Sequence, residues 1–157
     1  MMWILRPFDQ LETEELFAIY KERVAVFVVE QACPYPEVDD LDKEALHLFA
    51  KDQHGITAYC RLIPTKDQLK LGRVLVVKRV RKSGLGRDLI AKALEVAKEY
   101  FPDLPVYAQA QAYLEQFYGS FGFKPISEIY LEDDIPHLDM MKDLSLIHIS
   151  EPTRLGM

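Results

Sequence analysis

Residues 73–87 have the sequence Arg-Val-Leu-Val-Val-Lys-Arg-Val-Arg-Lys-Ser-Gly-Leu-Gly-Arg, and this stretch decides the fold. Its apolar, β-branched first part predicts a buried strand at 69–77, at the centre of a sheet. The pattern Arg-x-x-Gly-x-Gly at 81–86 then predicts a turn that opens a helix over 84–100. Because the first amides of a helix lie at the positive end of its dipole, the turn is a candidate anion site.

Charge is unevenly distributed along the 157 residues. The net charge of −6 argues against a dedicated nucleic-acid binder. Residues 70–87 nevertheless contain seven basic residues and no acidic one, whereas residues 36–44 contain five acids and one lysine. The first stretch could attract a polyanion and the second a cation, and two solvated faces are the alternative interpretation.

The remaining pattern predicts one domain over residues 1–143 of mixed α/β (α+β) class. A strand at 3–7 precedes an amphipathic helix at 11–26, with Asp9 as its N-cap and Glu12 completing a capping box. We expect a mixed, mostly antiparallel sheet with helices on both faces. Its further elements are strands at 45–51 and 56–63 joined by a tight turn, a strand at 106–109, a short helix at 112–120, and a closing strand pair at 123–131 and 137–142.

The composition indicates where in the cell the protein is found. No apolar run approaches the roughly 20 residues that cross a bilayer, and the first residues form no signal peptide. Cys33 and Cys60 are the only cysteines, too few for a disulfide framework or a four-cysteine metal site. We therefore expect a cytoplasmic protein with no membrane partner, no nucleic-acid partner and no metal.

The C-terminal residues are treated separately. The sequence Leu-Ser-Leu-Ile-His-Ile-Ser-Glu-Pro-Thr-Arg at 144–154 resembles the translation of a common sequencing adapter. We expect residues 144–157 to be a non-native, disordered tail and exclude them from the fold.

Two motifs are similar to those of the GNAT acetyltransferases. The pattern at 81–86 resembles the family's motif A, and Phe-Tyr-x-x-x-Gly-Phe at 117–123 resembles its motif B. The resemblance implies a GNAT-type acyl-CoA N-acyltransferase fold with acetyl-CoA as co-substrate. It implies that the turn binds the pyrophosphate and that the preceding strand pairs with the pantetheine arm. The residues so implicated are Val74, Leu75, Val76, Arg81, Lys82, Ser83, Gly84, Leu85, Gly86, Arg87, Gln111 (where many relatives have Asn) and Tyr118.

The resemblance also implies a catalytic role for Tyr118, which would protonate the departing thiolate. A thiol has a pKa near about 8.5 and a phenol near about 10, so a nearby phenol can stabilise or protonate the sulfur. The alternative is an aromatic side chain packed beside Phe117.

Residues 5–141 resemble the bacterial ElaA group of this superfamily. The similarity is carried by Arg-x-x-Val-Phe-Val-Val-Glu-Gln-x-Cys-Pro-Tyr-x-Glu-x-Asp-x-x-Asp at 23–42 and by Ile-Pro-His at 135–137. In GNAT folds the first helix and the following loop form the acceptor side. Its acids would bind a cationic amine, or Arg23 would pair with one of them to fix the loop. The candidate acceptor residues are Arg23, Glu30, Tyr35, Glu37, Asp39 and Asp42.

The predicted reaction is direct acetyl transfer to a primary amine of a small molecule or peptide. The amine must lose a proton, and Glu37, Asp39, His47 and His137 are the candidate bases. Both histidines have an alternative role as hydrogen-bonded core residues, and we expect Cys33 to be a small buried hydrophobe rather than a nucleophile.

Two other functions stay open. Arg23, Phe27, the acids at 37–42 and Arg-Leu-Ile-Pro-Thr at 61–65 also resemble acyl-homoserine lactone synthases. A non-catalytic acyl-CoA sensor is the second alternative. The possibility of a homodimer is likewise left open by the sequence.

Overall fold

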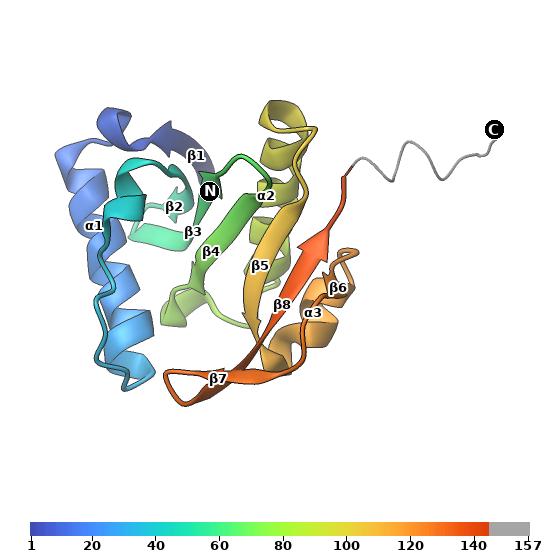
Figure 1. Ribbon diagram of the computed structural model, residues 1–157. Coiled ribbons are helices and arrows are strands. Elements are labelled where there is room, and N and C mark those ends of the chain that lie inside the picture. Colours follow the sequence, from blue (N-terminus) through green and yellow to red (C-terminus); the bar gives the residue numbers. More distant parts are fainter. Residues whose placement is uncertain (145–157) are drawn as a thin grey trace. The chain divides into compact units, whose positions relative to one another are not determined.

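The computed structural model describes residues 1–144. They form two compact units, one made of Met1–Ile63 and Gly72–Ala93, the other of Pro64–Leu71 and the residues from Leu94 on. The helices and strands (Figure 1) are β1 (Met2–Pro7), α1 (Thr13–Arg23), β2 (Leu46–Asp52), β3 (Gly55–Pro64), β4 (Leu69–Val76), α2 (Leu85–Tyr100), β5 (Val106–Gln111), α3 (Glu115–Gly119), β6 (Lys124–Pro125), β7 (Tyr130–Glu132) and β8 (Ile135–Lys142).

In the first unit, β1 and β3 pair antiparallel with the two edges of β2. The tight turn predicted between β2 and β3 is confirmed, with Asp52 opposite Gly55. Apolar side chains that alternate along the strands meet those of α1 in one core. Its buried members are Ile19, Phe49, Ile56, Tyr59, Leu75 and Val77.

In the second unit, Leu69–Leu71 of β4 pair in parallel with Val106–Ala108 of β5. Strand β8 pairs antiparallel with β5, and the short strands β6 and β7 pair antiparallel with β8. The sheet order is β1-β2-β3-β4-β5-β8-β6, with β7 attached to β8. The predicted mixed, mostly antiparallel sheet with a central strand at β4 is confirmed.

The predicted start of the first helix is wrong. Phe8–Gln10 form a separate 3-10 turn and Leu11 is extended, so Asp9 is not the N-cap of α1. Glu12 takes the N-cap position instead, and its N–H donates to Glu15 Oε1 at 2.9 Å. Such a capping interaction contributes about 1 kcal/mol.

The end of this helix also differs from the prediction of residue 26. Helix α1 ends at Arg23 and continues as a π-helical segment, Val24–Glu30. Six of the seven residues of this segment are apolar and four are valines, so its sequence contains no capping or glycine signal that would mark an end.

The strand predicted at 123–131 is two short strands. Pro125 lies opposite Met140 and Tyr130 opposite His137, so this side contains two more residues than the facing side of β8. The extra residues bulge out between β6 and β7. Asp133 and Asp134, both with positive φ, make the tight turn into β8.

Two further predictions concern the C-terminal tail and membrane-spanning helices. The tail predicted at 144–157 falls outside the described residues, except for Leu144. Among residues 1–144, no helix has the length and apolar character needed to cross a membrane.

Candidate active site

The turn predicted to bind an anion lies in the first unit, between β4 and α2. Its backbone enters the left-handed region twice, at Lys82 (φ 67°) and at Gly84 (φ 83°). At the start of α2 the Asp88 N–H donates to the Gly84 carbonyl at 3.2 Å. Leu85 and Gly86 are the first two residues of this 16-residue helix, so their amides lie at the positive end of its dipole.

This turn is open to solvent. Residues 81–84 are exposed, and a Cβ placed on Gly84 would meet no atom within 4 Å. The side chains of Lys78, Lys82 and Arg87 around it are also exposed. Left-handed turns with unpaired amides form concave anion sites, and the cations add long-range attraction. The turn therefore stays a candidate anion site.

Strand β4 leads into the turn with one side turned to the core. Leu75 and Val77 are buried in the core of the first unit, and the Val77 N–H donates to the Thr57 carbonyl at 2.9 Å. Val74 and Val76, which alternate with them, remain half-exposed.

Arg81 contacts two other segments of the first unit. Its Nε donates to the Val76 carbonyl at 2.9 Å, while Nη1 and Nη2 donate to the two carboxylate oxygens of Glu30 at 2.8 and 2.7 Å. The hydrogen bond from Arg81 lowers the pKa of Glu30. The structure thus connects the end of β4, the turn and the π-helical segment.

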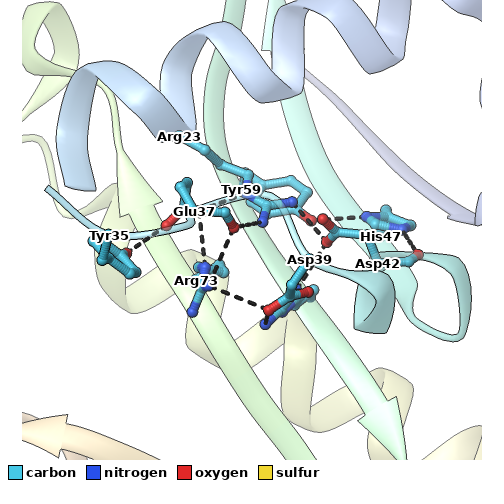
Figure 2. A network of polar contacts seen from close by, with 9 residues as sticks. Arg23, Tyr35, Glu37, Asp39, Asp42, His47, Tyr59 and Arg73 are labelled. Atoms are coloured by element: carbon cyan, nitrogen blue, oxygen red, sulfur yellow. Dashed lines mark hydrogen bonds and ion pairs between the residues drawn. The ribbon is translucent and has the colours of Figure 1, made fainter. Parts of the chain in front are cut away.

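Arg23 is fully buried at the end of α1 and lies at the centre of an ionic network (Figure 2). Its Nε donates to Glu37 Oε2 at 2.8 Å, and its Nη1 donates to Asp42 Oδ1 at 2.7 Å. Its Nη2 donates to the Glu37 carbonyl at 2.9 Å. The alternative that Arg23 pairs with an acid of the following loop is therefore confirmed, and the structure shows two such acids.

Two further arginines complete the network. Arg61 Nη1 donates to Asp39 at 2.7 Å and to Asp42 at 2.9 Å, and Arg73 Nε donates to Glu37 Oε2 at 2.8 Å. Three guanidinium groups thus balance three carboxylates. Removing one member of a buried pair typically costs about 3–5 kcal/mol, since the remaining charge is left uncompensated.

Contacts in the network shift the pKa values of Asp39 and Tyr35. Burial opposes ionisation of the Asp39 carboxyl, but the hydrogen bond from Arg61 and the positive charges of Arg61, Arg73 and Arg23 together outweigh it, so the pKa of Asp39 is lowered. The Tyr35 hydroxyl donates to Glu37 Oε1, and burial followed by this bond raises the pKa of Tyr35. Among the candidate acceptor residues, the ionised form of Asp39 and the neutral form of Tyr35 are therefore favoured.

Arg73 has an unusual backbone for a strand residue, with φ of 51° inside β4. The left-handed conformation costs a residue with a Cβ about 1–2 kcal/mol. Such strain persists only where surrounding contacts determine the conformation, and it concentrates at functional sites.

His47 is a core residue. It is fully buried, with Nδ1 2.7 Å from the Tyr59 hydroxyl and Nε2 2.8 Å from the Asp42 carbonyl. Since a carbonyl only accepts, Nε2 carries the proton and Nδ1 accepts from Tyr59. Burial lowers the pKa of His47, so the neutral ring is favoured. The alternative of a hydrogen-bonded core histidine is confirmed.

The other predicted site residues lie in the second unit. Tyr118 is buried in α3, edge-on to Phe117 and Phe123 with ring centroids 5.3 and 5.6 Å away. Gln111 ends β5 opposite His137 of β8, whose Nδ1 lies 2.7 Å from the Ile135 carbonyl. The surroundings of Tyr118 are thus those of a packed aromatic side chain.

The cysteines form no disulfide. Cys33 is half-buried rather than enclosed, whereas Cys60 is fully buried, and burial raises the pKa of its thiol. In residues 1–144 no group of three or more His, Cys, Asp or Glu side chains could hold a metal ion.

A family model for the acetyltransferase (GNAT) domain matches residues 14–144. The chain belongs to the GNAT acetyltransferase family. Within it, this GNAT protein is ElaA-like: it is 41% identical to ElaA of Escherichia coli over 141 residues, 87% of this chain and 92% of ElaA. A UPF0039 protein of Schizosaccharomyces pombe is 43% identical over 145 residues, 90% of this chain and 97% of that protein.

Solved structures support the assignment of this chain to the GNAT family. The crystal structure of E. coli ElaA matches with a TM-score of 0.87 at 38% identity, and that of an acyl-CoA N-acyltransferase from Pseudomonas aeruginosa with 0.87 at 41%. Each comparison covers 90% of this chain and 99% of the other. A CoA-dependent acyl-homoserine lactone synthase, at 18% identity and a TM-score of 0.74, shares the fold alone.

Sequence reasoning about this GNAT protein missed the roles of Arg61 and Arg73 in the network. Arg61 had a usable signal, because it is the single charged residue in the apolar run 56–63 and a buried arginine requires a carboxylate partner. Arg73 was counted with the basic stretch, and nothing in its neighbourhood marks its left-handed backbone.

The buried His47 predicts a pH dependence of stability. The folded protein binds a proton at this ring less readily than the unfolded chain, whose histidine pKa is about 6.5. Its contribution should be present above that pH and be lost as the pH falls below it. Denaturation measured from pH 8 to 5.5 should therefore show falling stability in the wild type and a flatter profile in His47→Gln. The same slope in both proteins would contradict this assignment, since all other histidines are shared.

Proposed function

We propose that this chain is an N-acetyltransferase that moves an acetyl group from acetyl-CoA directly to a primary amine of a small molecule or peptide. Membership of the GNAT family supports acyl transfer from an acyl-CoA. The observation that carries the finer proposal is the open, cation-rich turn from 81 to 87 at the start of α2.

The diphosphate of the coenzyme would bind at this turn. The main-chain amides of Lys82, Ser83, Gly84, Leu85 and Gly86 would donate to phosphate oxygens, and the guanidinium of Arg87 would add a charge-assisted contact. The chemistry of this donor set suits an anion, because it supplies N–H groups and positive charge and no carboxylate from within the turn.

The pantetheine arm would pair with Val74, Leu75 and Val76. Extended ligands add to a strand through its main-chain groups. The half-exposed Val74 and Val76 leave one side of β4 available while Leu75 fixes the other side in the core. A main-chain N–H near Val76 would stabilise the oxyanion of the thioester carbonyl.

The transfer requires two proton movements. The amine nitrogen bonds to the carbonyl carbon and gives up a proton to a base, while the carbon–sulfur bond breaks and the thiolate takes up a proton. We propose Tyr118 as the acid, with Gln111 contacting the coenzyme. Glu37, Asp39 and His137 remain the candidate bases.

The acceptor would bind beside the loop that follows α1. Arg23, Glu30, Tyr35 and Asp42 are the proposed acceptor residues, but each carboxylate among them is paired with an arginine. We therefore propose that the arginine pairs define the shape of the acceptor side and that only part of the negative charge is available to a cation. A cytoplasmic location fits the small cysteine content.

The proposal is tested by thiol release from acetyl-CoA over a panel of polyamines, amino acids, aminoglycosides and peptides. Acceptor-dependent release with stoichiometric acetyl-amine formation is expected. Acyl transfer only from acyl carrier protein to S-adenosylmethionine would support the lactone-synthase alternative instead. Tight acetyl-CoA binding without release from any acceptor would support the sensor.

Gly84→Asp tests the diphosphate site. A carboxylate at this position should weaken acetyl-CoA binding at least about tenfold, or 1.4 kcal/mol, through repulsion of the diphosphate. Gly84→Asn is the matched control, because asparagine has the same shape, no charge, and tolerates the positive φ of Gly84. Titration calorimetry compares the two, and equal affinity of the aspartate variant and the wild type would rule out the site.

Tyr118→Phe tests the acid. General acid catalysis typically contributes about 10²-fold or more, so kcat should fall by that order while the Kd for acetyl-CoA stays nearly unchanged. Tyr113→Phe serves as control, since Tyr113 is an exposed tyrosine of the same segment. Unchanged kcat in Tyr118→Phe would remove this residue from the mechanism.

A further inference from the structure

Arg73 combines a strained backbone with a fully engaged side chain. Its φ of 51° lies in the left-handed region, although it is a strand residue. It follows the part of β4 that pairs with β5, which ends at Leu71, and it directly precedes Val74. The conformation of Arg73 therefore sets the direction in which the chain continues to Val76.

The side chain of Arg73 is held by the loop between α1 and β2. Nε donates to Glu37 Oε2 at 2.8 Å, Nη2 donates to the Glu37 carbonyl at 3.2 Å, and Nη2 lies 3.5 Å from Asp39 Oδ2. The guanidinium carbon also lies 5.6 Å from the centre of the Tyr35 ring. Figure 2 shows the three loop residues converging on Arg73.

The loop residues are themselves fixed from the other side. Glu37 accepts from the fully buried Arg23 and from the Tyr35 hydroxyl, and Asp39 accepts two hydrogen bonds from Arg61. Because Arg23 lies in α1 and Arg61 in β3, the loop presents its acceptors to Arg73 at defined positions. The contacts can therefore determine a backbone conformation that Arg73 would otherwise avoid.

We infer that Arg73 is a positioning residue: the loop side chains of Tyr35, Glu37 and Asp39 hold its guanidinium, and this keeps β4 in the left-handed conformation that directs Val74–Val76 toward the acyl-CoA arm. The inference rests on the proposed function, because it assigns to Val74–Val76 the binding of that arm. It also gives the acidic loop a role in binding the coenzyme, beyond its proposed role toward the acceptor.

Substitutions of Arg73 can distinguish two roles: ion pairing alone, or holding the backbone of residue 73 in the left-handed conformation. If only the charge pairs mattered, every variant that lacks the guanidinium would behave alike. If the backbone of residue 73 matters, glycine should replace arginine better than alanine, since glycine adopts positive φ at no steric cost. Arg73→Ala and Arg73→Gly thus form a matched pair that differs in one methyl group.

The experiment compares the wild type, Arg73→Ala and Arg73→Gly in acetyl-CoA binding, thermal unfolding and ¹⁵N amide spectra. Arg73→Ala should weaken acetyl-CoA binding about tenfold, whereas Arg73→Gly should stay within about threefold of the wild type. Without ligand, the amide signals of Val74–Val76 should shift in the alanine variant and keep their wild-type positions in the glycine variant. Both variants lose the same ion pairs, so both unfolding temperatures should fall below that of the wild type.

Equal losses of affinity in the two variants, or no loss in either, would overturn the inference. Failure of the wild type to bind acetyl-CoA would overturn the proposed function and the ligand part of the inference with it. In that case the amide signals of Val74–Val76 without ligand would still show whether the contacts of Arg73 with the loop determine the conformation of β4.

Discussion

A guanidinium group that has no contact with solvent must be neutralised within the protein, and the first unit is built around this requirement at Arg23. The residue ends α1, yet its partners Glu37 and Asp42 come from the loop that follows. Fixing the loop in this way brings Glu37 to Arg73 in β4 and Asp42 to Arg61 in β3. One buried cation thus links the first helix, an irregular loop and two strands.

This requirement changes the interpretation of the acidic stretch at 36–44. Glu37, Asp39 and Asp42 are matched by three arginines, so they contribute little field outside the network. Asp40 and Glu44 are exposed and keep their charge toward solvent. In the basic stretch, Arg79 pairs with Asp52 and Arg81 with Glu30, and both pairs are exposed. The side chains of Lys78 and Lys82 are exposed as well.

The sequence predicted those elements that have a strong local signal. Strands β2, β3 and β4 and helix α2 lie within about two residues of their predicted bounds, since apolar alternation and the glycine turn mark them directly. It did not predict the π-helical continuation of α1, because the run Val24–Glu30 suits several conformations. The motif residues of the turn were found in sequence, and residues 81–84 are exposed in the structure. The pairing of Arg73 with Glu37 depends on how β4 and the loop pack, which no local pattern encodes.

The distribution of the ion pairs determines how the molecule responds to ionic strength. Dissolved salt screens exposed charges over about 8–10 Å, but reaches buried pairs far less. The network around Arg23 is buried, whereas the Arg81–Glu30 and Arg79–Asp52 pairs are exposed. Added salt therefore weakens mainly the attraction of anions to the basic turn and the two exposed ion pairs. The buried ion pairs of Arg23 are affected far less.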